Sequence, residues 1–128
     1  MAEYFGGDFI YSTLSTSTAL SALISTNIFN ARMVPKDTAS LETVNFYPVI
    51  PYDPRSEVFA STWSADCRSA TDSGALEIAR VVVATLNRLS SAVGGYTYFA
   101  VTGMGGPIPP ADDTDVYNCP VSIILRRR

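Results

Sequence analysis

Residue types that commonly perform catalysis are scarce in this sequence. Its 128 residues include no histidine, which Ser-His and Cys-His nucleophile systems and the common histidine-based metal sites require. Cys67 and Cys119 do not form a C-x-x-C pair, and two cysteines alone cannot complete a structural zinc site. Lys36, the only lysine, lies in an expected loop without the serine motif of a Ser-Lys hydrolase. The sequence therefore predicts a protein that is not an enzyme.

Two further segments have compositions that can bind ions. The "GMGG" of residues 103–106 resembles a phosphate-binding loop, but it lacks the P-loop lysine and is followed by prolines and a strand. Asp112, Asp113 and Asp115 could bind a hard cation such as calcium, although no glutamate follows at EF-hand spacing. The alternatives for these aspartates are a solvated loop and ion pairs with a neighbouring chain. We expect neither a metal nor a cofactor.

Two groups of charged residues, the C-terminal arginines and a pair of aspartates, have more than one possible role. The terminal Arg126–Arg128 could contact DNA phosphates or an acidic partner surface, or could act as a solubilising tail. An unrecognised acid pair, Asp66 with Asp72, is the one enzymatic alternative. Their position beside a turn is explained equally well by helix capping.

Composition bounds the class of protein. Hydrophobic residues make up 47% of the chain, which is ordinary, whereas charged residues at 16% fall below the usual ~25%. We therefore expect a surface rich in Ser, Thr, Gly and Pro, partly buried against partners. The formal net charge of −3 argues against a free-standing nucleic-acid binder. We expect one domain over residues 1–128, without a secretory signal or a membrane span, and with Cys67 and Cys119 as buried free thiols.

The first half of the chain predicts short helices followed by strands. Residues 8–26 have the spacing of two short helical turns, and the Ser/Thr run at 15–18 supplies an N-cap for the second. A short extended piece is expected at 27–35. The stretch 41–50 is rich in β-formers, and Pro48 places it near an edge or a bulge.

A strand with two distinct faces is expected at 58–69. One face carries Phe59, Ser61, Trp63, Ala65 and Cys67, and polar or small residues occupy the alternate positions. Such alternation indicates a sheet covered on one side, and Trp63 is then a core residue.

A long amphipathic helix is expected next, from about Ser73 to Val93. Thr71 or Asp72 would cap its start, and Gly94–Gly95 would end it, because glycine tolerates the left-handed conformation that follows a helix.

Two strands are expected after the glycines, at 96–102 and 115–127. Pro120 indicates an unpaired side or an irregularity in the second. The Gly/Pro-rich connection between them is too long for a tight hairpin. The prediction is an α+β fold: a single mixed, mainly antiparallel sheet with one long helix and a short N-terminal helical segment packed on one face.

These segments together resemble a known family. The pieces "NIFNARMVP", "VNFYPVI" and "ASTWSADCRSATDSGALEIARVVVATLNRL" precede a last strand that ends in arginine. In that order they are similar to the tail terminator family of long-tailed bacteriophages, also called tail completion or tail-to-head joining proteins. The resemblance covers nearly the whole chain. Its most telling part is the strand of form x-W-x-A-D-C-R-S-x-T leading into an alanine-rich helix.

The resemblance implies a structural role in the virion neck. Family members form a ring, usually of six copies, on the finished tail tube, where they stop polymerisation and face the head-tail connector or stopper protein. DNA later passes through the opening, which implies no sequence-specific binding, and assembly takes place in the host cytoplasm. The family has no catalytic residues to transfer.

Candidate interface residues are our own inference, drawn from the 51–57 turn, the Gly/Pro-rich loop, the acidic segment and the arginine tail. They are Arg55, Glu57, Gly103, Met104, Gly105, Gly106, Pro107, Ile108, Asp112, Asp113, Asp115, Arg126, Arg127 and Arg128. The proline-rich loop departs from the family pattern.

Two alternatives to a terminator remain open. Another neck component, such as a head completion or stopper protein, would tend to be β-barrel-like, which the strong helix disfavours. A small α+β ligand-binding module would need a pocket lined by Tyr96, Tyr98 and Trp63.

Overall fold

Six strands form one mixed sheet in the part of the chain that the computed structural model describes, residues 6–30, 42–50, 60–109 and 116–127. The sheet order is β1-β2-β3-β6-β5-β4; β1 pairs with β2 in parallel, and the other pairs are antiparallel. Three helices complete the described fold, which confirms the predicted α+β class. In chain order the elements are α1 (Gly7–Ser15), α2 (Thr18–Ile24), β1 (Ile28–Asn30), β2 (Thr43–Ile50), β3 (Ala60–Ser69), α3 (Asp72–Leu86), β4 (Ser90–Val93), β5 (Tyr96–Met104) and β6 (Tyr117–Arg127).

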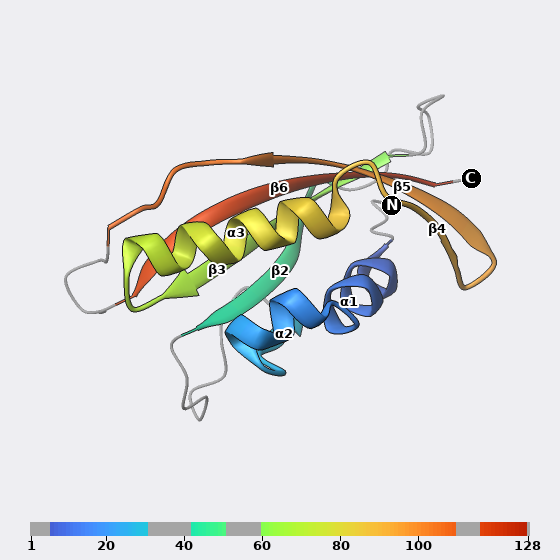
Figure 1. The fold of residues 1–128 in the computed structure, drawn as a ribbon. Coiled ribbons are helices and arrows are strands. Elements are labelled where there is room, and N and C mark those ends of the chain that lie inside the picture. Colours follow the sequence, from blue (N-terminus) through green and yellow to red (C-terminus); the bar gives the residue numbers. More distant parts are fainter. Residues whose placement is uncertain (1–5, 31–41, 51–59, 110–115, 128) are drawn as a thin grey trace.

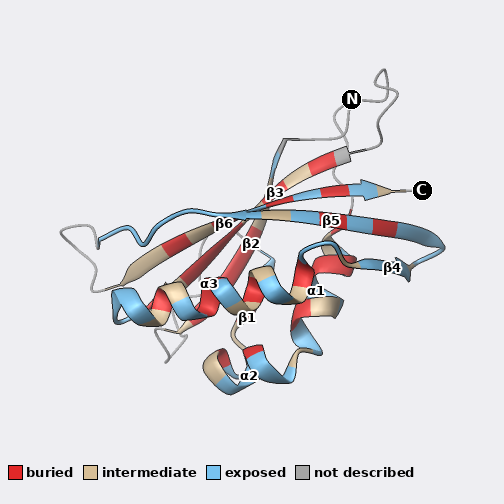
Figure 2. Cartoon of the chain, turned by 45° about the horizontal axis from the view of Figure 1, so that its top comes forward, coloured by how far each residue is buried: buried red, intermediate tan, exposed pale blue. Residues whose placement is uncertain are grey.

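The core lies between one face of the sheet and the three helices, which all cover the same side (Figures 1 and 2). Its centre is the β3–β6 pair, where Trp63 lies opposite Ile123 and Cys67 opposite Cys119. Trp63 is only 4% exposed, which confirms it as a core residue. The expected alternation in β3 is also confirmed from Ser61 to Cys67, because the odd-numbered positions are buried, while Phe59 lies outside the described residues. In β6 the odd-numbered positions from Cys119 to Leu125 are buried in the same way. None of the described helices is long and apolar enough to cross a membrane.

Polar caps fix the starts of α2 and α3 as expected. Ser17 Oγ accepts a hydrogen bond from the Leu20 N–H at 3.2 Å, within the predicted Ser/Thr run. Thr71 Oγ1 accepts from the Gly74 N–H at 3.0 Å, which selects Thr71 over Asp72 as the cap of α3. Each cap satisfies a backbone donor that the first helical turn leaves without a partner.

Both strand prolines lie where the sheet is interrupted. The β2–β3 register shifts between Pro48 and Ile50, which confirms the expected bulge. Pro120 lies in the interior of the sheet, but β5 ends at Met104, and only the Gly105 N–H reaches the Pro120 carbonyl, at 3.0 Å. Since the N and O of a strand residue point to the same side, the missing N–H of Pro120 faces the end of β5 and costs no ladder bond.

The predicted end of the long helix is wrong. α3 ends at Leu86, Asn87 has an extended backbone, and Ser90–Val93 forms β4, a sixth strand that pairs with β5. Gly94 (φ 62°) and Gly95 (φ 84°) form the two-residue turn between them. Two successive residues with positive φ match the twist of a hairpin, so the glycines turn a strand rather than stop a helix.

The predicted loop and arginine tail also need correction. β5 continues through Gly103 and Met104, and Ile108 exchanges backbone hydrogen bonds with Asn118 at 2.6 and 3.2 Å. Arg126 and Arg127 belong to β6 and pair with β5, which confirms the strand expected at 115–127 and excludes a solubilising tail for these two residues. The reason is the length of β6: its 11 residues offer backbone partners to both neighbouring strands.

Candidate functional site

The β4–β5 hairpin, which projects at the C-terminal end of β6 (Figure 1), is held by aromatic contacts. The Tyr98 ring stacks on Phe9 of α1 with centroids 5.2 Å apart, and Tyr96 meets Tyr98 edge-on at 6.5 Å. The Arg127 guanidinium lies 4.2 Å from the centroid of the Tyr96 ring. A cation over an aromatic face is attracted by the ring quadrupole, so Arg127 ties the hairpin to the last strand.

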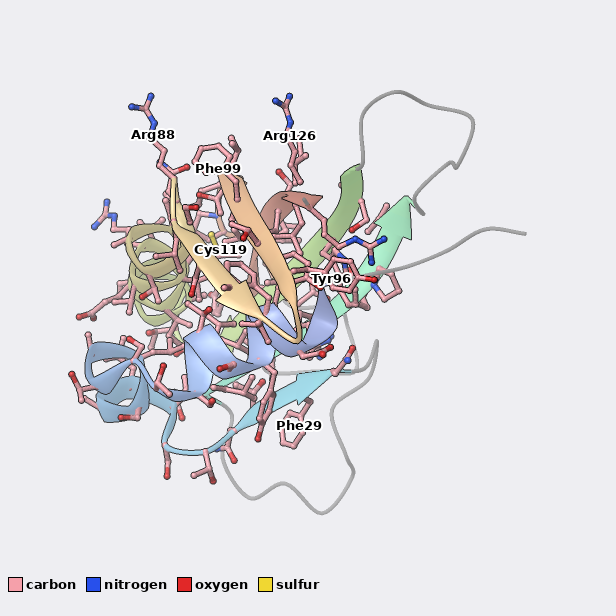
Figure 3. All side chains as sticks on the ribbon, turned by 90° about the vertical axis from the view of Figure 1, so that its right-hand side faces the viewer. Phe29, Arg88, Tyr96, Phe99, Cys119 and Arg126 are labelled. Carbon is pink, nitrogen blue, oxygen red and sulfur yellow. The ribbon has the colours of Figure 1, made fainter. Side chains whose placement is uncertain are left out.

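A groove of about 300 Å³ opens beside this hairpin. We call it the arginine groove; it is lined by Ser90, Thr97, Tyr98, Phe99 and Arg126. Phe99 and Arg126 are cross-strand neighbours on the sheet face that the helices leave uncovered, which we call the outer face. Figure 3 shows Arg88, Phe99 and Arg126 pointing in the same direction. A guanidinium beside two hydroxyls and an aromatic ring can bind a carboxylate.

Exposed apolar side chains adjoin the groove on the outer face. Val101 lies directly opposite Ile124, and each is 42% exposed. Phe99, two residues from Val101 on the same face, is 37% exposed. Sequence reasoning missed these three residues and Arg88. The available signal was the consecutive apolar residues in "YTYFAVT" and in "SIIL", which place apolar side chains on both faces of each strand.

Acidic residues gather at the other end of the sheet, where β6 begins. Ser69, the last residue of β3, pairs with Tyr117 and donates a hydrogen bond to Glu42 Oε1 at 3.4 Å. Asp72 and Glu77 are exposed on the first turns of α3. Arg88 follows the end of α3, and Arg126 and Arg127 end β6, so these three arginines lie at the opposite end of the sheet, where Asp8 is a neighbour of Tyr98. Arg68, the basic residue near the acidic end, lies 3.8 Å from Asp66.

The acid pair considered as an enzymatic alternative is divided between separate partners. Asp66 accepts a hydrogen bond from Tyr47 Oη at 3.3 Å and lies 3.8 Å from the Arg68 guanidinium. Asp72 Oδ1 accepts from the Ser73 N–H at 2.7 Å. Within the described ranges, no three His, Cys, Asp or Glu side chains are grouped so as to hold a metal ion.

Cys67 and Cys119 are directly opposite each other in the core, and both are free, as predicted. Burial raises the pKa of Cys67 well above its ordinary value of 9.0, and the neighbouring Cys119 and Asp66 raise it further. Burial also raises the pKa of Cys119, whose thiol donates to the Gly105 carbonyl at 3.2 Å. Because the thiolate is the reactive form, neither thiol is suited to nucleophilic chemistry.

The candidate interface residues fall into three groups. Arg126 and Arg127 lie at the hairpin, and Gly103 and Met104 lie at the far end of β5. Gly105, Gly106, Pro107 and Ile108 follow β5 and are exposed, with Ile108 at 49%. The structure therefore does not bring these residues into one site. Outside the described residues lie Arg55, Glu57, Asp112, Asp113, Asp115 and Arg128.

Comparison with known proteins adds one informative result. No family model and no curated protein matches the sequence. Among solved structures, the fold matches a chain described as "Virion of native gene transfer agent (GTA) particle", with a TM-score of 0.69 and 14% sequence identity. The match covers 92% of this chain and 90% of that chain. At this identity the similarity establishes a shared fold over nearly the full length.

Proposed function

We propose that this chain is a structural virion protein, specifically a tail terminator of a long-tailed bacteriophage or a related particle. In this role six copies form a ring on the head-proximal end of the tail tube, end its polymerisation and join it to the head connector or stopper protein. The observation that carries the proposal is the fold match to a virion chain over 92% of the sequence. The family resemblance of the sequence, which rests on different information, points to the same class.

The proposed role is carried out by surfaces and not by a reaction. Charged residues make up only 16% of the chain, and the outer face exposes Phe99, Val101 and Ile124. Depletion of charge and exposed apolar side chains are typical of the buried centre of protein interfaces. We therefore expect no catalysis and no cofactor. Its partners would be further copies, the tube protein and the head-side connector, and phage DNA would pass through the ring without sequence-specific contacts.

Two observations favour a terminator over the alternatives. The described strands form one open sheet with β1 and β4 as its edges, whereas a head completion or stopper protein is expected to resemble a β-barrel. Among the described residues, the trio expected to line the pocket of a ligand-binding module does not come together, because Trp63 is a core residue and Tyr96 lies against Arg127. Of that expected trio, only Tyr98 lines the arginine groove.

The test uses the purified chain and a candidate tail tube protein from the same genome. Mixtures are examined by negative-stain electron microscopy, and mass is measured by light scattering for the chain alone and for the chain mixed with the tube protein. We expect ring-shaped density at one end of each tube and a multimeric mass in the bound state. A chain that stays monomeric or dimeric and ignores tube ends would overturn the proposal. Tubes mixed with an unrelated protein of similar size serve as the control.

A further inference from the structure

The arginine groove contains one cationic side chain, that of Arg126, and Figure 3 shows Arg88 pointing the same way outside its lining. Neither Arg126 nor Arg88 forms an ion pair with another described residue, and both side chains are exposed. In that view they lie on either side of Phe99. An arginine presents its N–H groups in a planar fork that matches a carboxylate, and the hydroxyls of Ser90 and Thr97 line the same groove. The groove is therefore complementary to an acidic side chain.

Apolar contacts would support that ion pair. Phe99 forms part of the groove, and Val101 and Ile124 continue from it along the outer face. A partner that covers this surface would remove water from around Arg126. An ion pair is screened less when water is excluded, so the apolar residues strengthen the charged contact beside them.

Matching negative charge is found at the other end of the same molecule. Asp72 and Glu77 are exposed on the first turns of α3 and form no ion pair with another described residue. Along β6, Tyr117 at the acidic end and Arg126 in the groove are separated by ~30 Å at ~3.3 Å per residue. That distance exceeds the screening length of ~8 Å at physiological salt, so the two ends of one copy do not neutralise each other.

We propose that copies of this chain associate head to tail, with Asp72 and Glu77 of one copy placed at the arginine groove of the next. Ends of like charge would repel each other, which favours a contact between the unlike ends of two copies. Repeating such a contact produces a closed ring or an open filament. This inference rests on the proposed function and deepens it, because it assigns the surfaces through which the ring would close.

Charge reversal separates this contact from general electrostatic effects. Arg126→Glu puts a negative charge in the groove and should weaken association at least tenfold; Glu77→Arg should do the same from the other side. The double variant R126E/E77R should recover much of the association, because the two reversed ends again attract. Arg80→Glu is the matched control: it makes the same chemical change on α3, one turn from Glu77, and should leave association unchanged or strengthen it.

Association is followed by light scattering over a range of protein and salt concentrations, and by counting labelled copies on tube ends. Circular dichroism and melting temperature check that each variant is folded. Wild-type association should weaken as salt increases. The inference is overturned if R126E associates like wild type, or if the double variant shows no recovery.

Two further outcomes identify what failed. If D112N/D113N/D115N abolishes association while E77R and D72R do not, the groove binds a different acidic segment and the assigned α3 surface is wrong. If the wild-type chain neither associates nor binds tube ends, the proposed function fails and this inference with it. If rings form normally with R126E, the proposed function still holds and only the surfaces assigned to the contact are wrong.

Discussion

At the residue scale, one glycine controls how the N-terminal helix joins the sheet. Gly6 precedes α1 with φ 98°, and a Cβ at this position would overlap Leu125 Cδ1 of β6. Both the backbone conformation and the missing side chain are therefore required. The sequence shows a glycine pair at 6–7, but not that the core residue Leu125 would approach it.

Substituting Gly6 by Ala should destabilise the protein by about 2–4 kcal/mol, since it combines left-handed strain with overpacking against Leu125. Urea unfolding followed by circular dichroism measures the change. Gly106→Ala is the control, because no atom lies within 4 Å of its added Cβ and its φ is not positive. Equal effects of the two substitutions would contradict the packing described for Gly6.

The buried thiols make a second prediction at this scale, a loss of stability in alkali. The folded pKa of Cys67 lies above its unfolded value, so below about pH 9 the thiol is protonated in both states and its contribution is complete. Above that pH the unfolded chain loses the proton first. The free energy of unfolding should then fall with rising pH, by up to about 1.4 kcal/mol per pH unit for each thiol.

Urea midpoints measured at pH 7 to 10 under reducing conditions test this behaviour. Cys67→Ala should be less stable at pH 7, because it leaves a space in the core, but its stability should decline less steeply above pH 9. The pKa of Tyr98 is also raised above its ordinary value of 10.0, so its titration lowers the free energy of unfolding only above about pH 10, and does so equally in the wild type and in Cys67→Ala. An unchanged slope in the variant would show that Cys67 does not titrate as described.

Individual core residues were predictable from the sequence, whereas the neighbours of exposed residues on the outer face were not. Alternation in β3 identified Trp63 and Cys67 as buried, because strand geometry places alternate residues on one face. Arg126 was expected in the last strand, but its position beside Phe99 depends on the pairing of β6 with β5. The spacing of residue types along the chain does not predict which distant segments will pair as strands.

At the element scale, residues 87–95 form a hairpin instead of a longer helix because their backbone pairs with β5. Leu86, Leu89 and Val93 continue a helical apolar stripe, and on that pattern the helix extends to the glycines. In the structure, the Arg88 N–H donates to the Ala100 carbonyl at 2.8 Å and the Ala100 N–H donates to Leu89 at 3.0 Å. These bonds to β5 replace the last helical turns.

The turn that closes this hairpin is sensitive to side chains. Gly95→Val should destabilise the protein by about 1–2 kcal/mol, because a β-branched residue is strained at φ 84°. Gly94→Asn should have little effect, since Asn-Gly is favoured in turns with two positive φ angles. The melting temperatures of the two variants give the comparison. A Gly94→Asn protein as unstable as Gly95→Val would argue against this turn.

At the scale of the whole molecule, the fold class could be predicted but the arrangement of charge could not. Alternating strands, an amphipathic helix and their order led to an α+β sheet covered on one side, which the structure confirms. In the fold, α3 and β6 lie along the same axis (Figure 1). Only this arrangement places the negative charges of Asp72 and Glu77 at one end and the positive charges of Arg88 and Arg126 at the other. The periodicity of the sequence does not record which charged residues the fold brings to each end.

A tail terminator must end the growth of a tail tube. The most direct measurement is the length distribution of tubes polymerised from the tail tube protein with and without this chain, determined by electron microscopy. We predict that adding the chain during growth shortens the tubes in proportion to its concentration, and that capped tubes do not elongate when fresh tube protein is supplied. Tubes that reach the same lengths and elongate equally well in its presence would contradict the account.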